Sequence, residues 1–265
     1  MKSEALEKLT LEASRIIRSV GDFIRGEVGR VGADRIEEKA LHSLVSYVDR
    51  TAEEQLVGQL GRLLPGSAFL TEEETVETAE SELLWIIDPL DGTTNFLHQL
   101  PCFAISVALQ EEGRTILGIV LEINREELFY AWKGGGAFLN GKEVRVSPAT
   151  DLKDSLLATG FPYYDFEGMQ GYLDALAVFM QETRGIRRLG SAAVDLAYVA
   201  CGRFEAFFEY SLHSWDVAAG AFIVQEAGGH VSDFSGGDDY LYGGEILASN
   251  LGIYNQVLSV ISETF

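Results

Sequence analysis

The chain has 265 residues, of which 47% are hydrophobic and 23% are charged. This composition supplies a sizeable core and excludes a largely disordered chain, and the length suits one compact unit because single cores stop growing near about 250–300 residues. The formal net charge of −21 argues against a basic surface for nucleic acid and suits metal cations. For most of the 41 acidic residues we expect only a role in solubility.

Features of the chain also bear on its compartment. Residues 1–17 mix charges into their apolar positions and lack the uncharged core of a signal peptide. No apolar run in the sequence approaches the length of a membrane span. Cys102 and Cys201 are the only cysteines and stand in apolar sequence, so we expect them in the core rather than in a disulfide. We therefore predict a cytoplasmic protein without a membrane partner.

The first half of the chain begins with helical patterns and continues with strand patterns. Apolar residues at helical spacing predict a long amphipathic helix over 6–24, and a second helix is expected over 49–64. Runs rich in aliphatic and β-branched residues predict strands over 83–87, 103–109, 116–123 and 128–132. Asn140 and Gly141 between apolar runs predict a hairpin. Residues 83–147 are therefore expected to form a largely antiparallel sheet.

In the second half, helical and strand patterns are interspersed. Helices are expected near 166–182, 191–201, 215–227 and 251–263, and strands near 155–159, 204–209, 230–234 and 246–249. Helices that sandwich sheets are the simplest architecture for this order. Because the sequence has no repeat and no proline-rich linker, we treat residues 1–265 as one unit with sub-lobes of approximately 1–150 and 151–265.

Residues 85–96 carry the strongest chemical signal. An apolar strand ends at Asp88, Pro89 stiffens the chain, and Asp91 follows three residues later, so both carboxylates can face one point. A bare Asp-Gly-Thr is more often only a tight turn. The full string, with two acids and a proline directly after a buried strand, favours a functional site.

The residues after Asp91 are suited to bind an anion. Gly92 lets a ligand approach the backbone, and Thr93 to Asn95 can start a helix whose free N–H groups face outward. Carboxylates beside a phosphate site make physical sense if Mg²⁺ lies between them, since Mg²⁺ prefers oxygen ligands and binds carboxylates and phosphate together.

Two further acidic features are less specific. Most of residues 72–74 suits a solvated loop, and only a carboxylate beside the strand would ligate a metal. Asp216 falls in the first turn of a predicted helix, where helix capping and a functional role are equally reasonable. The small residues 218–220 indicate close approach to a neighbouring element.

Together these segments resemble the inositol monophosphatase family, within the lithium-sensitive, metal-dependent phosphatase superfamily of fructose-1,6-bisphosphatase and the bisphosphate nucleotidases. Residues 85–96 and 215–229 match its two signatures, and Glu72 with Glu73 matches its glutamate pair. The resemblance implies an α+β fold, a layered α-β-α-β-α sandwich of the sugar-phosphatase type. Its N-terminal sheet is expected to be largely antiparallel, and a second, mixed sheet is expected in the C-terminal half.

The resemblance also implies a set of site residues. It implies two or three Mg²⁺ ions held by Glu72, Asp88, Asp91, Asp216 and the backbone carbonyl of Leu90. It assigns catalysis to Glu72, which holds the attacking water on a metal, and to Thr93 with Asp49, which orient it. Substrate contacts are implied for Asp91, Gly92, Thr93, Gly190, Ser191, Ala192, Glu209 and Asp216. Ser43 stands where many relatives carry an aspartate, so one supporting interaction near the site is expected to differ from theirs.

The activity that this resemblance implies is Mg²⁺-dependent hydrolysis of a small phosphate monoester by metal-activated water. The first candidate substrate is myo-inositol monophosphate, which would give inositol and phosphate. Alternatives on the same fold are 3′-phosphoadenosine 5′-phosphate, fructose-1,6-bisphosphate and histidinol phosphate. A non-catalytic regulatory protein that retains the fold is the competing class, although the acids and Thr93 are all present. A homodimer and inhibition by lithium are further implications.

Overall fold

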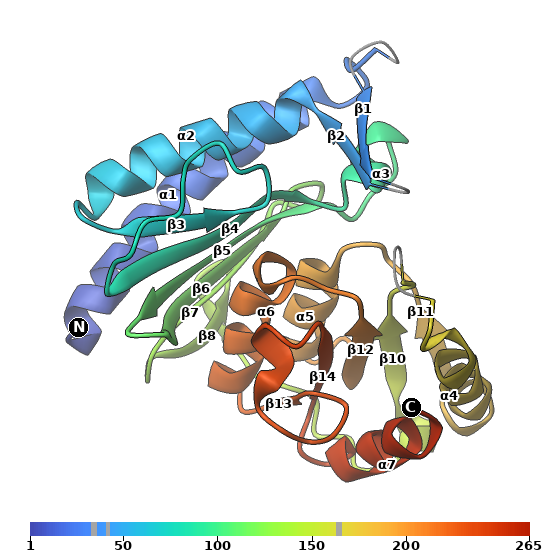
Figure 1. Cartoon of the computed structure of the whole chain (residues 1–265). Helices are drawn as coiled ribbons and strands as arrows, with labels where there is room; N and C mark the ends of the chain where they lie inside the picture. Colours follow the sequence, from blue (N-terminus) through green and yellow to red (C-terminus); the bar gives the residue numbers. More distant parts are fainter. Residues whose placement is uncertain (33–35, 41–42, 163–165) are drawn as a thin grey trace.

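A computed structural model of the chain describes residues 1–32, 36–40, 43–162 and 166–265. For residues 36–40, 43 and 44 it describes the backbone alone, so the expectation about Ser43 concerns a side chain outside the described part. Five layers follow one another through the molecule: two helices, a seven-stranded sheet, two helices, a five-stranded sheet and two helices (Figure 1). The predicted α-β-α-β-α sandwich is confirmed.

The described helices are α1 (Ser3–Glu27), α2 (Tyr47–Leu63), α3 (Thr93–Leu97), α4 (Met169–Glu182), α5 (Ala192–Ala200), α6 (Ser214–Glu226) and α7 (Tyr254–Thr264). The described strands are β1 (Ile36–Ala40), β2 (Ser43–Ser46), β3 (Ala68–Thr71), β4 (Leu83–Asp91), β5 (Ala104–Glu111), β6 (Arg114–Glu122), β7 (Glu127–Trp132), β8 (Gly136–Leu139), β9 (Lys142–Val144), β10 (Leu156–Thr159), β11 (Gly185–Arg187), β12 (Ala206–Tyr210), β13 (His230–Ser232) and β14 (Glu245–Ser249). Within this part of the chain, no helix is long and apolar enough to cross a membrane.

The seven-stranded sheet has the order β3-β4-β5-β6-β7-β8-β9. Its strands pair antiparallel except for β3 and β4, which are parallel. The expected hairpin is present between β8 and β9, with left-handed φ angles of 49° at Asn140 and 82° at Gly141. The antiparallel sheet is therefore confirmed, whereas the parallel edge strand β3 and the β1–β2 hairpin were not anticipated.

Helices α1 and α2 cover one face of this sheet (Figure 1). The apolar stripe of α1, including Leu9, Ile17 and Ile24, packs with Trp85 and Ile105 of the sheet in one buried cluster. Each such side chain contributes about 1.5–3 kcal/mol by leaving water. This packing explains why the helical spacing of apolar residues 6–24 predicted the element correctly.

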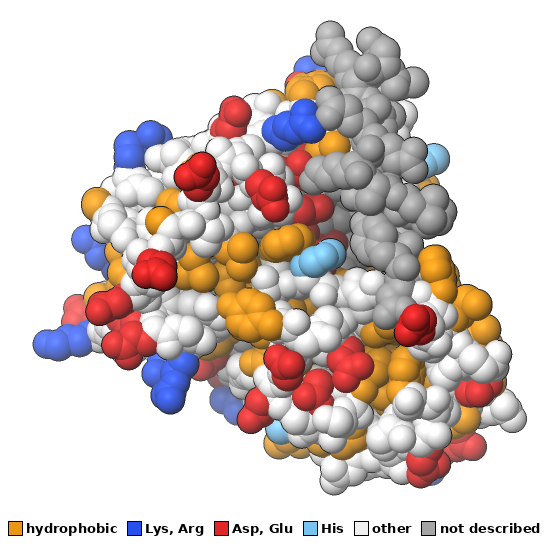
Figure 2. Space-filling view, viewed as in Figure 1, with side chains coloured by type: hydrophobic (Ala, Val, Ile, Leu, Met, Phe, Trp, Pro, Cys, Tyr) orange, Lys and Arg blue, Asp and Glu red, His pale blue; other side chains and the backbone are white. Residues whose placement is uncertain are grey.

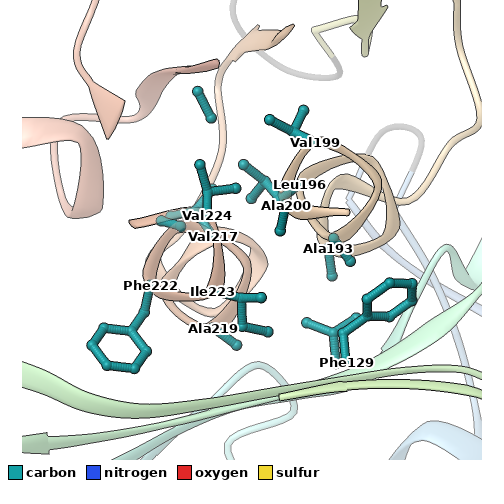
Figure 3. Close-up of a cluster of buried hydrophobic side chains, with 14 of the residues drawn as sticks. Phe129, Ala193, Leu196, Val199, Ala200, Val217, Ala219, Phe222, Ile223 and Val224 are labelled. Carbon is teal, nitrogen blue, oxygen red and sulfur yellow. The ribbon is translucent and has the colours of Figure 1, made fainter. Parts of the chain in front are cut away.

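Helices α5 and α6 lie between the two sheets (Figure 1), and Figure 3 shows their buried side chains packed together beside Phe129. The backbone of α6 lies directly against β6, where a Cβ on Gly118 would lie 2.7 Å from the carbonyl oxygen of Ala219. Its other side meets α5, where a Cβ on Gly220 would lie 2.6 Å from the Cβ of Leu196. The predicted close approach of residues 218–220 is thus confirmed, and it fixes the start of α6 relative to the sheet.

The second sheet has the order β11-β10-β12-β14-β13 and is mixed, with β10 parallel to β11 and β12 and with β14 antiparallel to β12 and β13. Its inner face packs against α5 and α6. Its outer face packs against α4 and α7, with Phe179, Phe208 and Val257 in the buried cluster. The prediction of a second, mixed sheet in the C-terminal half is confirmed.

Candidate active site

The end of strand β4 brings two aspartates to the same side of the sheet. Asp88 pairs with Ser106 of β5, and Asp91 pairs with Ala104, so three steps along β4 match two along β5. This bulge contains Pro89, a residue that sheets accept at such irregular positions. Residues three apart in a regular strand face opposite sides, whereas the bulge lets both carboxylates face one point. The Leu90 N–H donates to Asp88 Oδ1 at 2.9 Å and stabilises the bend.

Gly92 makes the sharp turn from β4 into helix α3. Its φ of 89° is left-handed, and a Cβ there would lie 2.9 Å from the Cys102 carbonyl oxygen and 3.1 Å from that of Gly190. Only glycine satisfies both constraints without strain. Asn95 fixes the same region, because its side-chain amide donates to the carbonyl oxygens of Cys102 and Leu189 at 2.7 and 2.8 Å.

Asp91 lies at the N-terminus of helix α5. Its Oδ2 accepts a hydrogen bond from the Ser191 hydroxyl at 2.6 Å and one from the Ala193 N–H at 2.8 Å. The first N–H groups of a helix lack partners within the helix and favour a negative charge. The segment 190–192, which was predicted to contact substrate, therefore lies beside Asp91. Asp91 Oδ2 holds the start of α5 in place through these hydrogen bonds.

Asp216 enters the same site from the first turn of helix α6. Its Oδ2 accepts the N–H of His213 at 2.7 Å, which closes the start of the helix. The hydroxyl of Ser106, opposite Asp88 in the sheet, donates to the carbonyl oxygen of Trp215 at 3.0 Å. This bond ties the start of α6 to β5, so Asp216 both caps its helix and faces the acids of β4.

The three aspartates converge closely enough to share a cation. One carboxylate oxygen of each of Asp88, Asp91 and Asp216 lies within 4.8 Å of the other two. Burial raises the pKa of Asp88 well above its usual range, and the charges of Glu72, Asp91 and Asp216 raise it further. Burial and then the charge of Asp216 raise the pKa of Asp91 to about 7. Such a cluster is unfavourable unless positive charge accompanies it.

Glu72 adds a fourth carboxyl group from the loop after β3. Its N–H donates to the carbonyl oxygen of Ile87 at 3.2 Å, which continues the β3–β4 pairing to the start of the site. Its side chain lines the same pocket as Asp88, and its charge raises the pKa of Asp88. Two carboxylates this close repel each other, so positive charge is favoured beside them.

Thr93 and Asp49 form the pair that the resemblance implied. The Thr93 hydroxyl lies 3.0 Å from Asp49 Oδ1 and 2.9 Å from the Leu90 carbonyl oxygen. The other oxygen of Asp49, Oδ2, accepts the N–H and hydroxyl of Ser46 at 2.8 and 2.7 Å, in the capping box that begins α2. Burial raises the pKa of Asp49, although the hydrogen bonds from Ser46 and Thr93 lower it in part.

Two more buried acids, Glu209 and Asp195, line the site. Burial raises the pKa of Glu209 well above its usual range, and the charge of Arg188 opposes this shift. A Cβ on Gly160 would lie 1.9 Å from Glu209 Oε1, so only glycine leaves room for this carboxyl group. Burial likewise raises the pKa of Asp195, whose Oδ1 has no hydrogen-bond partner within the described part of the chain.

These groups line one pocket of about 240 Å³. The described lining residues are Glu72, Asp88, Leu90, Asp91, Gly92, Thr93, Thr94, Gly160, Arg188, Gly190, Ser191, Ala192, Asp195, Glu209, Ser211, Leu212, His213, Trp215 and Asp216. Every residue that the sequence placed at the site lines this pocket except Asp49, which reaches it through Thr93. Their chemical roles stay predictions.

Sequence reasoning missed the residues that support the site. Ser106 of β5, Gly160 after β10 and Asp195 of α5 contact or line it. Gly160 directly follows the strand predicted near 155–159, and this position is the one local signal that could have marked it. Ser106 stands in the middle of the strand predicted over 103–109, where no local signal marks it.

Comparison with known proteins gives the family of this chain. The model of the inositol monophosphatase family matches residues 5–263, and the chain belongs to this family. It is 43% identical over 254 residues to the Nus factor SuhB of Pseudomonas aeruginosa, covering 94% of each chain. It is 39% identical to an inositol-1-monophosphatase of Mesorhizobium japonicum, covering 99% of this chain and 98% of the relative.

A solved structure extends the likeness to three dimensions. The extragenic suppressor protein SuhB from Bartonella henselae superposes with a TM-score of 0.90 at 38% identity, over 98% of this chain and 100% of that one. The family and fold are therefore established by sequence and by structure.

Proposed function

We propose that this protein is a Mg²⁺-dependent phosphatase of small phosphate monoesters, with myo-inositol monophosphate as its preferred substrate. The observation that carries the proposal is the convergence of Asp88, Asp91 and Asp216, with carboxylate oxygens within 4.8 Å of one another, beside the turn at Gly92. A phosphate could not enter so acidic a pocket without cations.

The residues present fit Mg²⁺. The donors are carboxylate oxygens and the Leu90 carbonyl, which are the ligands that this hard cation prefers. Glu72, Asp88, Asp91 and Asp216 would hold two or three ions, and one oxygen of Asp91 is already fixed by α5. Bound Mg²⁺ would lower the pKa of a water molecule and neutralise negative charge on the phosphoryl and leaving-group oxygens.

Thr93 and Asp49 would orient the attacking water. The Thr93 hydroxyl has one proton and two acceptors, Asp49 Oδ1 and the Leu90 carbonyl oxygen. When this proton points to Asp49, the hydroxyl oxygen can accept a hydrogen bond from the attacking water. This hydrogen bond would orient a lone pair of the water oxygen toward the phosphate. The buried, raised-pKa carboxyl group of Asp49 is suited to share the proton that the water releases.

The backbone after Asp91 would bind the phosphate. Gly92 and Thr93 line the pocket at the start of α3, where the first N–H groups of a helix lack intrahelical partners. We assign these N–H groups to the phosphoryl oxygens, in agreement with the resemblance.

The part of the pocket around Glu209 suits the hydroxyl groups of a polyol. Glu209 lines it together with Gly190, Ser191 and Ala192, and carboxyl groups accept hydrogen bonds from hydroxyls. The 39% identity to an inositol-1-monophosphatase supports the same substrate. A nucleotide bisphosphate, fructose-1,6-bisphosphate or histidinol phosphate would place its phosphate in the same site. The rest of each molecule would differ from inositol.

A second candidate is a regulatory role of the kind named in a relative. A protein 43% identical to this chain is called a Nus factor, so a role outside catalysis deserves a test. Retention of Glu72, Asp88, Asp91, Thr93 and Asp216 in one pocket favours the enzyme, because a scaffold has no need of clustered acids.

Phosphate release from a substrate panel tests the proposal. The purified chain is assayed with the four candidate substrates and a generic ester, in Mg²⁺ and in excess chelator. We expect Mg²⁺-dependent turnover with the highest kcat/KM for myo-inositol monophosphate, and inhibition by lithium. Turnover of inositol monophosphate no faster than that of the generic ester would contradict the substrate, and no turnover of any phosphate would leave the regulatory role.

A further inference from the structure

Helix α2 carries two buried carboxyl groups one turn apart, Asp49 and Glu53. Residues four apart lie on the same face of a helix. Asp49 contacts Thr93. Glu53 has 0% of its surface exposed, and the proposed reaction gives it no role.

The partner of Glu53 is the loop of residues 72–75, which carries Glu72. Glu53 Oε2 accepts the N–H of Glu73 at 2.8 Å. Glu53 Oε1 accepts the N–H and the hydroxyl of Thr75 at 2.8 and 2.7 Å. Both oxygens are therefore used to hold the backbone of this loop, which follows β3.

The loop conformation between these two contacts is one that needs support. Glu74 has a φ of 51°, in the left-handed region that residues with a Cβ rarely adopt. The Glu53 carboxyl group bonds the N–H groups on both sides of Glu74. It therefore stabilises a backbone shape that glutamate at this position would not favour alone.

Glu72 is fixed from the opposite side by the sheet. Its N–H donates to the carbonyl oxygen of Ile87 at 3.2 Å, and the next N–H along the chain donates to Glu53. The Glu72 side chain lies beside Asp88. Small changes in the loop would thus move a proposed metal ligand directly.

We propose that Glu53 is a positioning residue, which holds loop 72–75 so that the Glu72 carboxylate stays beside Asp88 in the metal site. The inference rests on the proposed function, because it assigns Glu72 to the metal. Since Asp49 and Glu53 share one face of α2, the same helix sets the place of the Thr93 hydroxyl and that of the Glu72 carboxylate. Supporting residues of this kind tune metal affinity more than they contact substrate.

Calorimetric titration of the metal-free full chain with Mg²⁺ tests this inference. Glu53→Gln replaces one acceptor oxygen by an NH₂ group, which cannot accept the N–H it faces. Glu205→Gln is the matched control, since Glu205 is a buried carboxyl group that accepts the Leu156 N–H at 2.6 Å and lies outside the described pocket lining. Melting temperatures and kcat are measured on the same samples.

We expect Glu53→Gln to bind Mg²⁺ roughly 10- to 100-fold more weakly than wild type. Its kcat should recover as Mg²⁺ is raised, with the KM for the phosphate ester little changed. Glu205→Gln should bind Mg²⁺ as wild type does, even if its melting temperature falls as far. Wild-type Mg²⁺ affinity in folded Glu53→Gln would overturn the inference.

Glu53→Asp keeps the test decisive if Glu53→Gln does not fold. This change keeps the charge but withdraws the carboxylate by one methylene from Glu73 and Thr75, so weaker Mg²⁺ binding is expected again. Unchanged affinity in this variant would overturn the inference equally. A wild-type chain that binds no Mg²⁺ would instead overturn the proposed function, which separates the two failures.

Discussion

The Thr93 hydroxyl is the residue-scale feature on which the proposed water attack depends most. Thr93→Ala removes the group that would orient the water, and we expect kcat to fall by about 10²–10⁴-fold. The Mg²⁺ affinity should change little, because the carboxylates remain. Thr93→Ser, which keeps a hydroxyl, should retain most of the activity. Steady-state kinetics on both variants check this prediction, and equal rates for Thr93→Ala and wild type would contradict it.

Asp195 is a buried acid of this pocket whose protonation links stability to pH. Its side chain is 1% exposed, and burial raises its pKa well above the usual range, with the charges of Glu209 and Asp91 adding to the shift. The folded chain therefore keeps a proton on Asp195 at pH values where the unfolded chain has lost it. Stability from this group is present below the ordinary aspartate pKa of about 3.9 and declines as pH rises above it.

Asp195→Asn should consequently stabilise the metal-free protein at pH 8 and not at pH 4. We expect a gain in the free energy of unfolding at pH 8 of about 1.4 kcal/mol for each unit by which folding raises the pKa of Asp195. Urea unfolding in chelator at the two pH values measures it. A gain of the same size at pH 4, or none at pH 8, would show that ionisation of Asp195 is not the cause.

At the scale of elements, the turn from β4 into α3 is a point of the site where backbone atoms leave no room for a Cβ. Gly92→Ala would place a Cβ 2.9 Å from the Cys102 carbonyl oxygen, on a backbone with φ of 89°. Gly113 is a matched control, since its φ is 74° but a Cβ at that position would have no heavy atom of the described chain within 4 Å. Both substitutions cost about 1–2 kcal/mol of backbone strain.

The two variants should therefore differ in a defined way. Gly92→Ala is expected to lose more stability than Gly113→Ala and to lower phosphate release, because the backbone at the proposed phosphate site must shift. Gly113→Ala should lose stability alone. Thermal unfolding and initial rates measure both effects, and full activity in Gly92→Ala would argue against a phosphate contact at this turn.

The elements that local patterns determine were predicted well from the sequence. The periodicity of α1, the apolar run of β4 and the Asn140–Gly141 hairpin reflect burial and turn chemistry that nearby residues decide. The bulge at Pro89 was not predicted, because a shift in register is defined only by the partner strand β5. The parallel pairing of β3 likewise depends on the neighbouring strand β4, which the residues of β3 alone do not identify.

The candidate site shows the same division. The acids proposed to bind metal were predicted from three short segments and their resemblance to a family, and the structure brings them into one pocket. From charge and spacing alone, Asp216 was as well explained as a helix cap, and it is indeed also a cap. The supports of the site, such as Ser106 to Trp215 and Glu53 to Thr75, join residues far apart in the chain. No local pattern marks such pairs.

At the scale of the whole molecule, the distribution of charge and apolar surface leads to a further prediction. Figure 2 shows Asp and Glu side chains over both parts of the visible face. Helix α4 nevertheless exposes Met169, Leu173 and Met180 at 44%, 47% and 66%. We predict a homodimer that covers such apolar side chains. Light scattering should give twice the 29.1 kDa of one chain, and that mass alone at micromolar concentration would contradict a stable dimer.

The most direct test of the central claim is Mg²⁺-dependent phosphate release by wild type and by Asp88→Asn. This substitution keeps the shape of a buried side chain. It removes one charge from the cluster of three aspartates, whose carboxylate oxygens lie within 4.8 Å of one another. We predict that folded Asp88→Asn loses at least about 10²-fold in kcat, and that wild type loses its activity in chelator and regains it with Mg²⁺. Near-normal phosphate release by folded Asp88→Asn in Mg²⁺ would contradict the assignment of this cluster as the catalytic metal site.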